Sequence, residues 1–226
     1  MAWHAPSNTD QAIAWLRARV PLTADEWQEL TDAAKQEAFT VAGVAQLDLV
    51  ADVLASLADA VEKGQSLAGW KKAIADRLEA AWDGTVDNPA WRLETIFRTN
   101  VQRAYSAGRY HEQQKSKADR PFLMFSAVLD KRTTPHCKAA DGTVLPIDSP
   151  WWHEHTPPCH FNCRSVTISL TASQAARYGV TAKPSALEAD DGFGAPPGAD
   201  DDEWPRREDY PPELWTQYEH ARRRET

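Results

Sequence analysis

The three cysteines of this 226-residue chain lie close together, and a histidine accompanies them. Cys137 stands alone, whereas Cys159, His160 and Cys163 share the stretch TPPCHFNCRS. Thiolate sulfur and imidazole nitrogen are the usual ligands of structural Zn²⁺. Two loops that meet at one edge of a sheet would bring Cys137, His160 and Cys163 to a single point. These three residues are therefore candidate ligands of a structural zinc ion.

A structural zinc ion takes four ligands, and the sequence leaves the fourth open. The candidates are Asp130, His136, His153, His155 and Cys159. Cys159 directly precedes His160, and neighbouring side chains of an extended chain point to opposite sides. We therefore leave Cys159 out of the expected site.

Three other interpretations of the same residues remain open. A disulfide could join Cys137 to Cys163 if their Cα atoms lie within about 7 Å of each other. A Cys-His pair with Asp130 could act as a nucleophile, which would also require a cleft and an oxyanion donor. The cysteines could equally be small buried hydrophobic residues, with His160 hydrogen-bonded in the core. An odd number of cysteines fits a reducing compartment better than a disulfide framework.

A second group of polar residues lies where a predicted strand ends, in LDKRTTP. Asp130 can accept backbone hydrogen bonds there, and an arginine can bind its carboxylate with two parallel bonds. We expect Asp130, Thr133 and either Arg132 or Arg164 to form a structural clamp rather than a catalytic site. Gly142, in the following Asp-Gly pair, marks a turn.

Helices are expected to dominate residues 1–87, because apolar residues recur there at intervals of three and four. A short helix precedes Pro21, and the pair Thr23 and Glu26 has the spacing of a capping box. The helix that it opens is expected to continue to Phe39 and to stop near Gly43. Two longer helices follow, over residues 47–61 and 67–82.

A long helix is predicted over residues 89–115, opened by Asn88 as its cap and Pro89 in its first turn. Its apolar face consists of Leu93, Phe97, Val101, Ala104 and Gly108. Arg98, Arg103 and Arg109 lie off that face. We interpret them as a solvated surface, with contact to an acidic partner or to phosphate as the alternative.

Alternating patterns after Pro121 predict about three strands, over residues 122–129, 143–146 and 165–170, with Cys137 in the turn after the first. A short helix follows over residues 171–178, and from about residue 183 the chain is expected to be extended and acidic, with a terminal helix near residues 211–224. The expected fold is α+β, mainly helical, with a small antiparallel or mixed sheet. Its expected domains are residues 1–87, 88–182 and 183–226.

Charge is unevenly distributed over the chain, whose net charge is −8. Residues 92–132 carry nine basic and four acidic side chains, whereas residues 187–226 carry five basic and twelve acidic ones. The overall charge argues against nucleic-acid binding by the whole surface. Because no leader-like start or span of roughly 20 apolar residues occurs, we expect a soluble cytoplasmic protein with no membrane partner.

The order of the motifs resembles the phage head morphogenesis family named after the F protein of bacteriophage Mu, whose members are also called minor head or minor capsid proteins. The likeness is carried by ETIFRTNVQRAYSAGRY, LDKRTTPHC, DGTVLP and PPCHFNCRS, over about residues 90–170. Carried over residue by residue, it gives weight to Asp130, Arg132, Thr133, Cys137, Gly142, His160, Cys163 and Arg164. Cys159 falls on a variable position of the motif.

The resemblance implies a structural component of the phage head, present in few copies, that assembles in the host cytoplasm and associates with the portal. Further partners would be the major capsid protein or scaffold, and genomic DNA inside the head. The resemblance implies no enzymatic activity. The alternatives are a virion hydrolase that depends on zinc or a thiol, and a DNA-binding head protein acting through Arg98, Arg103 and Arg109.

Overall fold

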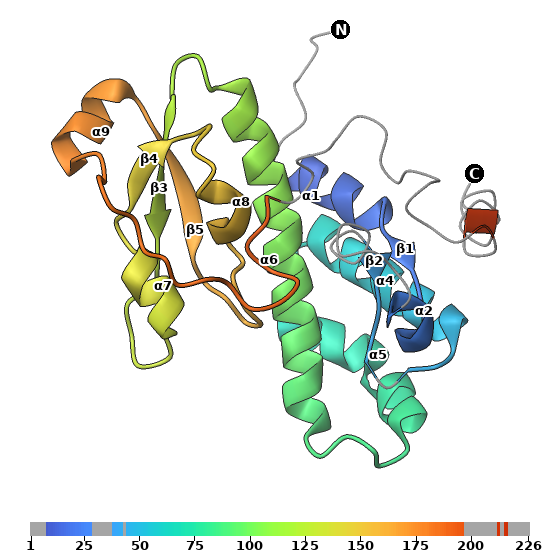
Figure 1. Ribbon diagram of the computed structural model, residues 1–226. Helices are drawn as coiled ribbons and strands as arrows, with labels where there is room; N and C mark the ends of the chain where they lie inside the picture. The colour runs from blue at the N-terminus through green and yellow to red at the C-terminus, as the bar shows by residue number, and fades with distance from the viewer. Residues whose placement is uncertain (1–7, 29–37, 43, 197–211, 213–214, 217–226) are drawn as a thin grey trace, which may run out of the picture. The chain divides into compact units, whose positions relative to one another are not determined.

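A computed structural model describes residues 8–28, 38–42, 44–196, 212 and 215–216 (Figure 1). The chain divides into two compact units. One consists of Ile13–Arg98 with Ala199–Thr226, and the other of Thr99–Gly198 with the residues up to Ala12. The division falls inside one long helix, and the domain boundaries expected from the sequence stay predictions. Helices and a small antiparallel sheet confirm the α+β class.

The first elements of the chain are α1 (Asn8–Arg17), β1 (Val20–Pro21), α2 (Ala24–Gln28) and β2 (Ala38–Phe39), and from Ile13 on they belong to the first of these units, the helical one. The capping box before α2 is confirmed: the Thr23 N–H donates to the Glu26 carboxylate (2.8 Å), and the Glu26 N–H donates to the Thr23 hydroxyl (3.4 Å). The prediction that this helix extends to Phe39 is wrong. Phe39 lies on β2, which pairs in parallel with β1, and its carbonyl accepts from the Leu22 N–H (2.8 Å).

The strand at Phe39 depends on contacts distant in sequence, which a helical pattern does not contain. Leu30, Ala34 and Gly43, which belong to the same prediction, lie outside the described residues.

Two long helices, α4 (Leu47–Glu62) and α5 (Leu67–Trp82), confirm the next predictions. Gly64 takes a positive φ of 61° after α4, and the Ser66 hydroxyl caps α5 by accepting from the Gly69 N–H (3.2 Å). The buried Trp70 indole donates to the Ser56 hydroxyl (2.9 Å), so the tryptophan joins the two helices by packing and by a hydrogen bond.

The long helix α6 (Pro89–Lys115) has the predicted bounds, and the Asn88 side chain accepts from the Trp91 N–H (3.0 Å) as its cap. The sheet follows, with β3 (Phe122–Ser126), β4 (Val144–Pro146) and β5 (Val166–Leu170) in the order β4-β3-β5 and both pairs antiparallel. Leu123 and Phe125 face one buried cluster, while Phe122 and Met124 pack against another.

The first strand ends three residues earlier than predicted, at Ser126. The Ala127 N–H donates to the Asp141 carboxylate (2.7 Å) instead of continuing the ladder. Val128 and Leu129, expected in the buried strand, are 47% and 60% exposed. A side-chain acceptor distant in sequence therefore stops the strand.

Three short helices complete this unit: α7 (Pro135–Ala140), α8 (Trp152–His155) and α9 (Ala172–Tyr178). Figure 1 shows α7 and α9 at opposite ends of the sheet. The short helix predicted over residues 171–178 is α9, and Thr171 caps it in a capping box with Gln174. Cys137 lies in α7 rather than in a turn, because Pro135 and the Thr134 cap continue the chain as a helix after the loop.

Residues 183–196 contain little regular structure and bond to the rest of their unit, so we call them the strap. Within the strap, the Ser185 carbonyl accepts from the Trp151 indole (2.8 Å), and Gly194 exchanges backbone bonds with residues 156 and 158. Of the predicted terminal helix, only Pro212, Trp215 and Thr216 are described, as helical; the remainder lies outside the described residues. No helix among the described residues is long and apolar enough to cross a membrane.

Replacement of Gly194 tests how closely the strap approaches the chain beneath it. A Cβ atom at Gly194 would lie 2.3 Å from the Glu154 carbonyl oxygen, whereas one at Gly192 would meet nothing within 4 Å. Both glycines have a positive φ, 88° and 78°, so Gly192→Ala is a matched control for backbone strain. We expect Gly194→Ala to lower the free energy of unfolding by about 1–3 kcal/mol more than Gly192→Ala. Equal urea midpoints for the two variants would contradict the close approach.

Candidate functional site

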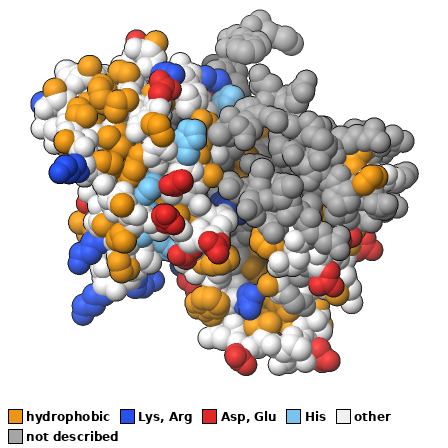
Figure 2. All heavy atoms as spheres, in the orientation of Figure 1, with side chains coloured by type: hydrophobic (Ala, Val, Ile, Leu, Met, Phe, Trp, Pro, Cys, Tyr) orange, Lys and Arg blue, Asp and Glu red, His pale blue; other side chains and the backbone are white. Residues whose placement is uncertain are grey.

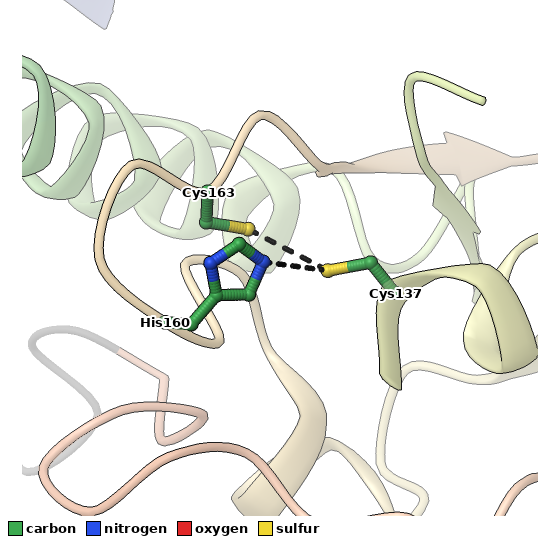
Figure 3. A group of neighbouring side chains, drawn as sticks. All are labelled: Cys137, His160 and Cys163. Carbon is green, nitrogen blue, oxygen red and sulfur yellow. Dashed lines mark hydrogen bonds between the residues drawn. The ribbon is translucent and has the colours of Figure 1, made fainter. Parts of the chain in front are cut away.

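Cys137, His160 and Cys163 converge in the structure as expected (Figure 3). Cys137 comes from α7, and the other two come from the loop before β5. The Cys137 sulfur lies 3.3 Å from His160 Nε2 and 3.8 Å from the Cys163 sulfur. The three ligand atoms all lie within 4.8 Å of one another, in the only such group among the described residues.

Local structure holds the loop of His160 and Cys163 in place. Asn162 takes a left-handed conformation with φ 57°, which asparagine tolerates better than most residues. Its N–H donates to the Thr99 hydroxyl of α6 (3.2 Å), and the Cys163 N–H donates to the His160 carbonyl (3.2 Å). The tight turn therefore brings His160 and Cys163 to the same side.

The imidazole of His160 is oriented by its own neighbour. Nδ1 lies 2.8 Å from the Phe161 carbonyl oxygen, which can only accept, so Nδ1 carries the proton. In the neutral ring, Nε2 then presents its lone pair toward Cys137. Histidines that bind metals show this arrangement, with one nitrogen fixed by a carbonyl and the other free to bind.

The distances distinguish between two kinds of cross-link. A disulfide requires about 2.05 Å between sulfur atoms, so the separation of 3.8 Å between Cys137 and Cys163 corresponds to two free thiols. A tetrahedral zinc ion with Zn–S of about 2.3 Å and Zn–N of about 2.0 Å places its sulfur ligands about 3.8 Å apart and sulfur and nitrogen about 3.5 Å apart. The two measured separations lie close to these values.

The electrostatics favour a charged group at this site. Contact with Cys137, and next with Cys159, lowers the pKa of the Cys163 thiol far below its usual range. Contact with Cys137 and Cys163 raises the pKa of His160 to about 10. Because a thiolate that is almost fully buried needs a compensating positive charge, the site suits a cation or an imidazolium.

Cys159 lies outside the group of three converging ligand atoms, as the sequence suggested, but it is buried beside them. Its thiol is 1% exposed, and its contacts with Cys137 and then Cys163 raise its pKa. The chain bends at His160, so the rule for neighbours in an extended strand does not apply there.

The other candidate ligands lie outside the converging group. The ring of His136 stacks on that of His155 at 5.5 Å, and His155 Nδ1 bonds to the Trp151 carbonyl (2.9 Å). His153 is exposed. The Asp130 carboxylate binds Arg164, so a catalytic array of Cys137, His160 and Asp130 is not assembled.

Asp130 and Arg164 form the clamp that the sequence suggested. The guanidinium donates two parallel bonds of 2.7 Å to the carboxylate, which also accepts from the Arg132 N–H (2.8 Å). The Thr133 hydroxyl accepts from the Asp130 N–H (2.9 Å). Gly142 takes a positive φ of 75°, and its N–H donates to the Phe125 carbonyl (2.9 Å), so it forms a turn.

Sequence reasoning missed a polar stripe on α6 that supports the loop. Its members are spaced at helical intervals and are Thr99, Gln102, Ser106 and Gln113. They bond, in that order, to the N–H of Asn162 (3.2 Å) and to the carbonyls of Ser165 (2.9 Å), Pro157 and Thr167 (3.2 Å). The apolar pattern of α6 does not reveal this stripe. The signal for it in the sequence is a set of polar residues that repeats at intervals of three and four.

The arginines of α6 have separate environments. Arg98 pairs with Glu94 (2.6 Å), Arg103 donates to the Gly192 carbonyl and lies 4.8 Å from the Phe193 ring centroid, and burial lowers the pKa of Arg109. Arg103 thus holds the strap. Contact of these arginines with phosphate stays a prediction.

The clamp generates a prediction about pH. Bonds from Arg164, then from the Arg132 N–H, hold the pKa of Asp130 well below its usual range. A carboxyl group with a lowered folded-state pKa stabilises the protein above its unfolded pKa of about 3.9 and loses this contribution as pH falls. Asp130→Asn should therefore have a lower urea midpoint than the unmodified protein at pH 7. The difference between the two midpoints should become smaller as the pH falls.

Asp119→Asn, at an exposed position, is the matched control and should follow the unmodified protein at every pH. A gap of constant size between Asp130→Asn and the unmodified protein across the acid range would contradict the assignment.

The chain is similar to known proteins over a region that includes the residues of this site. The family model described as "Phage Mu protein F like protein" matches residues 51–168, just over half of the chain. The putative capsid assembly protein F of Escherichia phage Mu is 29% identical over 195 residues, covering 80% of this chain and 44% of that protein. The Mu-like prophage FluMu F protein of Haemophilus influenzae is 27% identical over 176 residues, covering 74% of this chain and 41% of that protein.

The chain thus spans less than half the length of these two curated relatives. No solved structure gives a significant match. The family match covers most of α4, all of α5 and α6, the Asp130–Arg164 clamp and the whole Cys-His group, and with it the chain belongs to the family of Phage Mu protein F like proteins.

Proposed function

We propose that this chain is a minor head protein, a structural component of the virion that associates with the portal and the head shell during head assembly and takes part in genome delivery. The observation that carries the proposal is the similarity to the putative capsid assembly protein F of phage Mu over 80% of the chain. The proposed partners are the portal protein and the major capsid protein or scaffold. The proposed location is the phage head, after assembly in the host cytoplasm.

The part of the surface best suited to such a contact is the loop between β3 and α7. Val128 and Leu129 expose large apolar side chains there, beside the exposed Lys131 and Arg132. The clamp of Asp130 fixes the loop from within. An exposed apolar pair with basic neighbours fits a partner surface that is apolar and acidic.

Phe161 extends this surface from the loop of the Cys-His group. Its side chain is 60% exposed and meets the ring of Phe193 edge-on at 4.9 Å. Further exposed hydrophobic side chains in this unit are Ile168 on β5, Tyr178 in α9 and Val180 after it. Figure 2 shows hydrophobic side chains gathered on one part of the described surface. Aromatic side chains held by their neighbours serve well as interface anchors because they lose little entropy on binding.

The proposed role is structural and not enzymatic. The Cys-His pair at the site is almost completely enclosed on the cysteine side, since Cys137 is 2% exposed. Asp130, which would orient His160 in a catalytic array, binds Arg164 instead. The chemistry of these residues therefore supports cross-linking of the fold better than hydrolysis.

Substitution of the exposed loop tests the function. Leu129→Asp combined with Phe161→Asp should leave the circular dichroism spectrum unchanged but reduce the protein in purified heads at least tenfold, because a charge opposes burial in an interface. The measurement is quantitative immunoblotting of heads from the encoding phage or prophage, complemented by each variant.

Leu187→Asp, at a side chain that is 50% exposed on the strap, is the matched control and should enter heads normally. Normal entry of the double variant would reject this surface. Normal head assembly and infectivity without the protein would reject the head function itself.

A further inference from the structure

We infer that Cys137, Cys159, His160 and Cys163 together bind one Zn²⁺ ion as a structural centre with three thiolates and one imidazole. The inference concerns the fold of the chain and does not depend on its role in the head. It adds Cys159 to the three residues that the sequence singled out.

The first step is the spacing of the three close ligand atoms. The separations of 3.3 Å from the Cys137 sulfur to His160 Nε2 and 3.8 Å to the Cys163 sulfur are close to the edges of a tetrahedron around zinc, and the third pair of ligand atoms lies within 4.8 Å. The side chains point toward one another from two segments of the chain (Figure 3). Because Nδ1 of His160 carries a proton and donates it to the Phe161 carbonyl, Nε2 is the ring nitrogen that binds the ion.

The second step identifies the fourth ligand. Cys159 lies in the same buried cluster as Cys137 and Cys163 and directly precedes His160 in the chain. In this structure the thiol donates weakly to the His155 carbonyl, with 3.7 Å between sulfur and oxygen. In the proposed centre this contact is exchanged for a bond to zinc. Asp130 binds Arg164, and His136 and His155 stack on each other outside the group, so we assign Cys159, which shares the buried cluster, as the fourth ligand.

The third step is the enclosure of the site, which makes the centre structural. All three cysteines are at most 4% exposed, and Leu123, Phe125 and Trp152 belong to the same cluster. The strap covers the site from outside, because the Asp190 N–H donates to the Cys159 carbonyl (2.9 Å). Four protein ligands in a closed site leave no position for water or substrate.

The chemistry balances with proton release. Three protons pass to solvent as the ion binds: one from the Cys137 thiol, one from the Cys159 thiol, and the one that Cys163 and His160 share, which leaves Nε2 of the imidazolium so that this nitrogen can bind the ion. No electrons are transferred. Binding must therefore weaken as pH falls, and the energy of binding adds to the stability of the fold.

The test is metal content and Co²⁺ spectroscopy of the full chain, purified with reductant and without chelator. We expect about one zinc per chain. After exchange for Co²⁺, we expect thiolate charge-transfer bands and the intense visible bands of a tetrahedral site. Removal of zinc with a chelator should lower the thermal midpoint, and zinc but not Mg²⁺ should restore it, since Mg²⁺ prefers oxygen ligands.

Variants distinguish the ligands. Cys137→Ser, His160→Ala and Cys163→Ser should lose the ion, and Cys159→Ser should either lose it or lose about a third of the charge-transfer intensity with Co²⁺, as one of three thiolates. His153→Ala, an exposed histidine outside the group, is the control and should keep the full metal content.

A Cys159→Ser protein with unchanged zinc and an unchanged Co²⁺ spectrum would overturn the four-ligand centre. A reduced, folded chain that retains no zinc and gives no Co²⁺ bands would overturn the site altogether. Because both readouts use the unmodified protein or a single variant in vitro, failure of the zinc inference is distinguishable from failure of the head function.

Discussion

The Cys-His group depends on one constraint, the burial of the irregular segment that precedes His160. Residues 155–159 are all buried, although only His155 belongs to a helix. Backbone N–H and C=O groups that leave water must find partners, because an unpaired group costs the energy of its desolvation. Here the partners come from two places distant in sequence, the polar stripe of α6 and the strap.

These two partners explain features that local structure alone leaves unexplained. Burying threonine, serine and glutamine side chains on a helix costs the energy of their desolvation. Here these side chains form hydrogen bonds with the backbone between Pro157 and Thr167. The strap bonds the other side, through Thr156, Pro158 and Cys159. Its glycine at position 194 permits the approach, since any side chain there would strike the Glu154 carbonyl.

Elements with local signals could be predicted from the sequence, whereas contacts distant in sequence could not. Asn88, Ser66 and Thr171 mark helix starts through bonds to the next turn, so α5, α6 and α9 were predicted correctly. Phe39 joins a strand through pairing with β1, and Ala127 leaves one through a bond to Asp141; neither partner is evident from periodicity. Within the site, the spacing of His160 and Cys163 could be recognised in the sequence. The bend at His160 and the burial of Cys159 beside Cys137 and Cys163 could not be predicted from it.

The clamp and the Cys-His group join the same two segments, residues 130–137 and 159–164. The clamp is exposed and electrostatic, and therefore responds to pH and salt. The Cys-His group is buried, and the zinc ion that we infer there would make its stability depend on metal and on the reduced state of its thiols. Between the two cross-links the chain has little freedom, and Val128 and Leu129 lie immediately before the first of them. A loop fixed in this way loses less entropy when a partner covers it, so cross-links that stabilise the fold also favour binding by a preorganised surface.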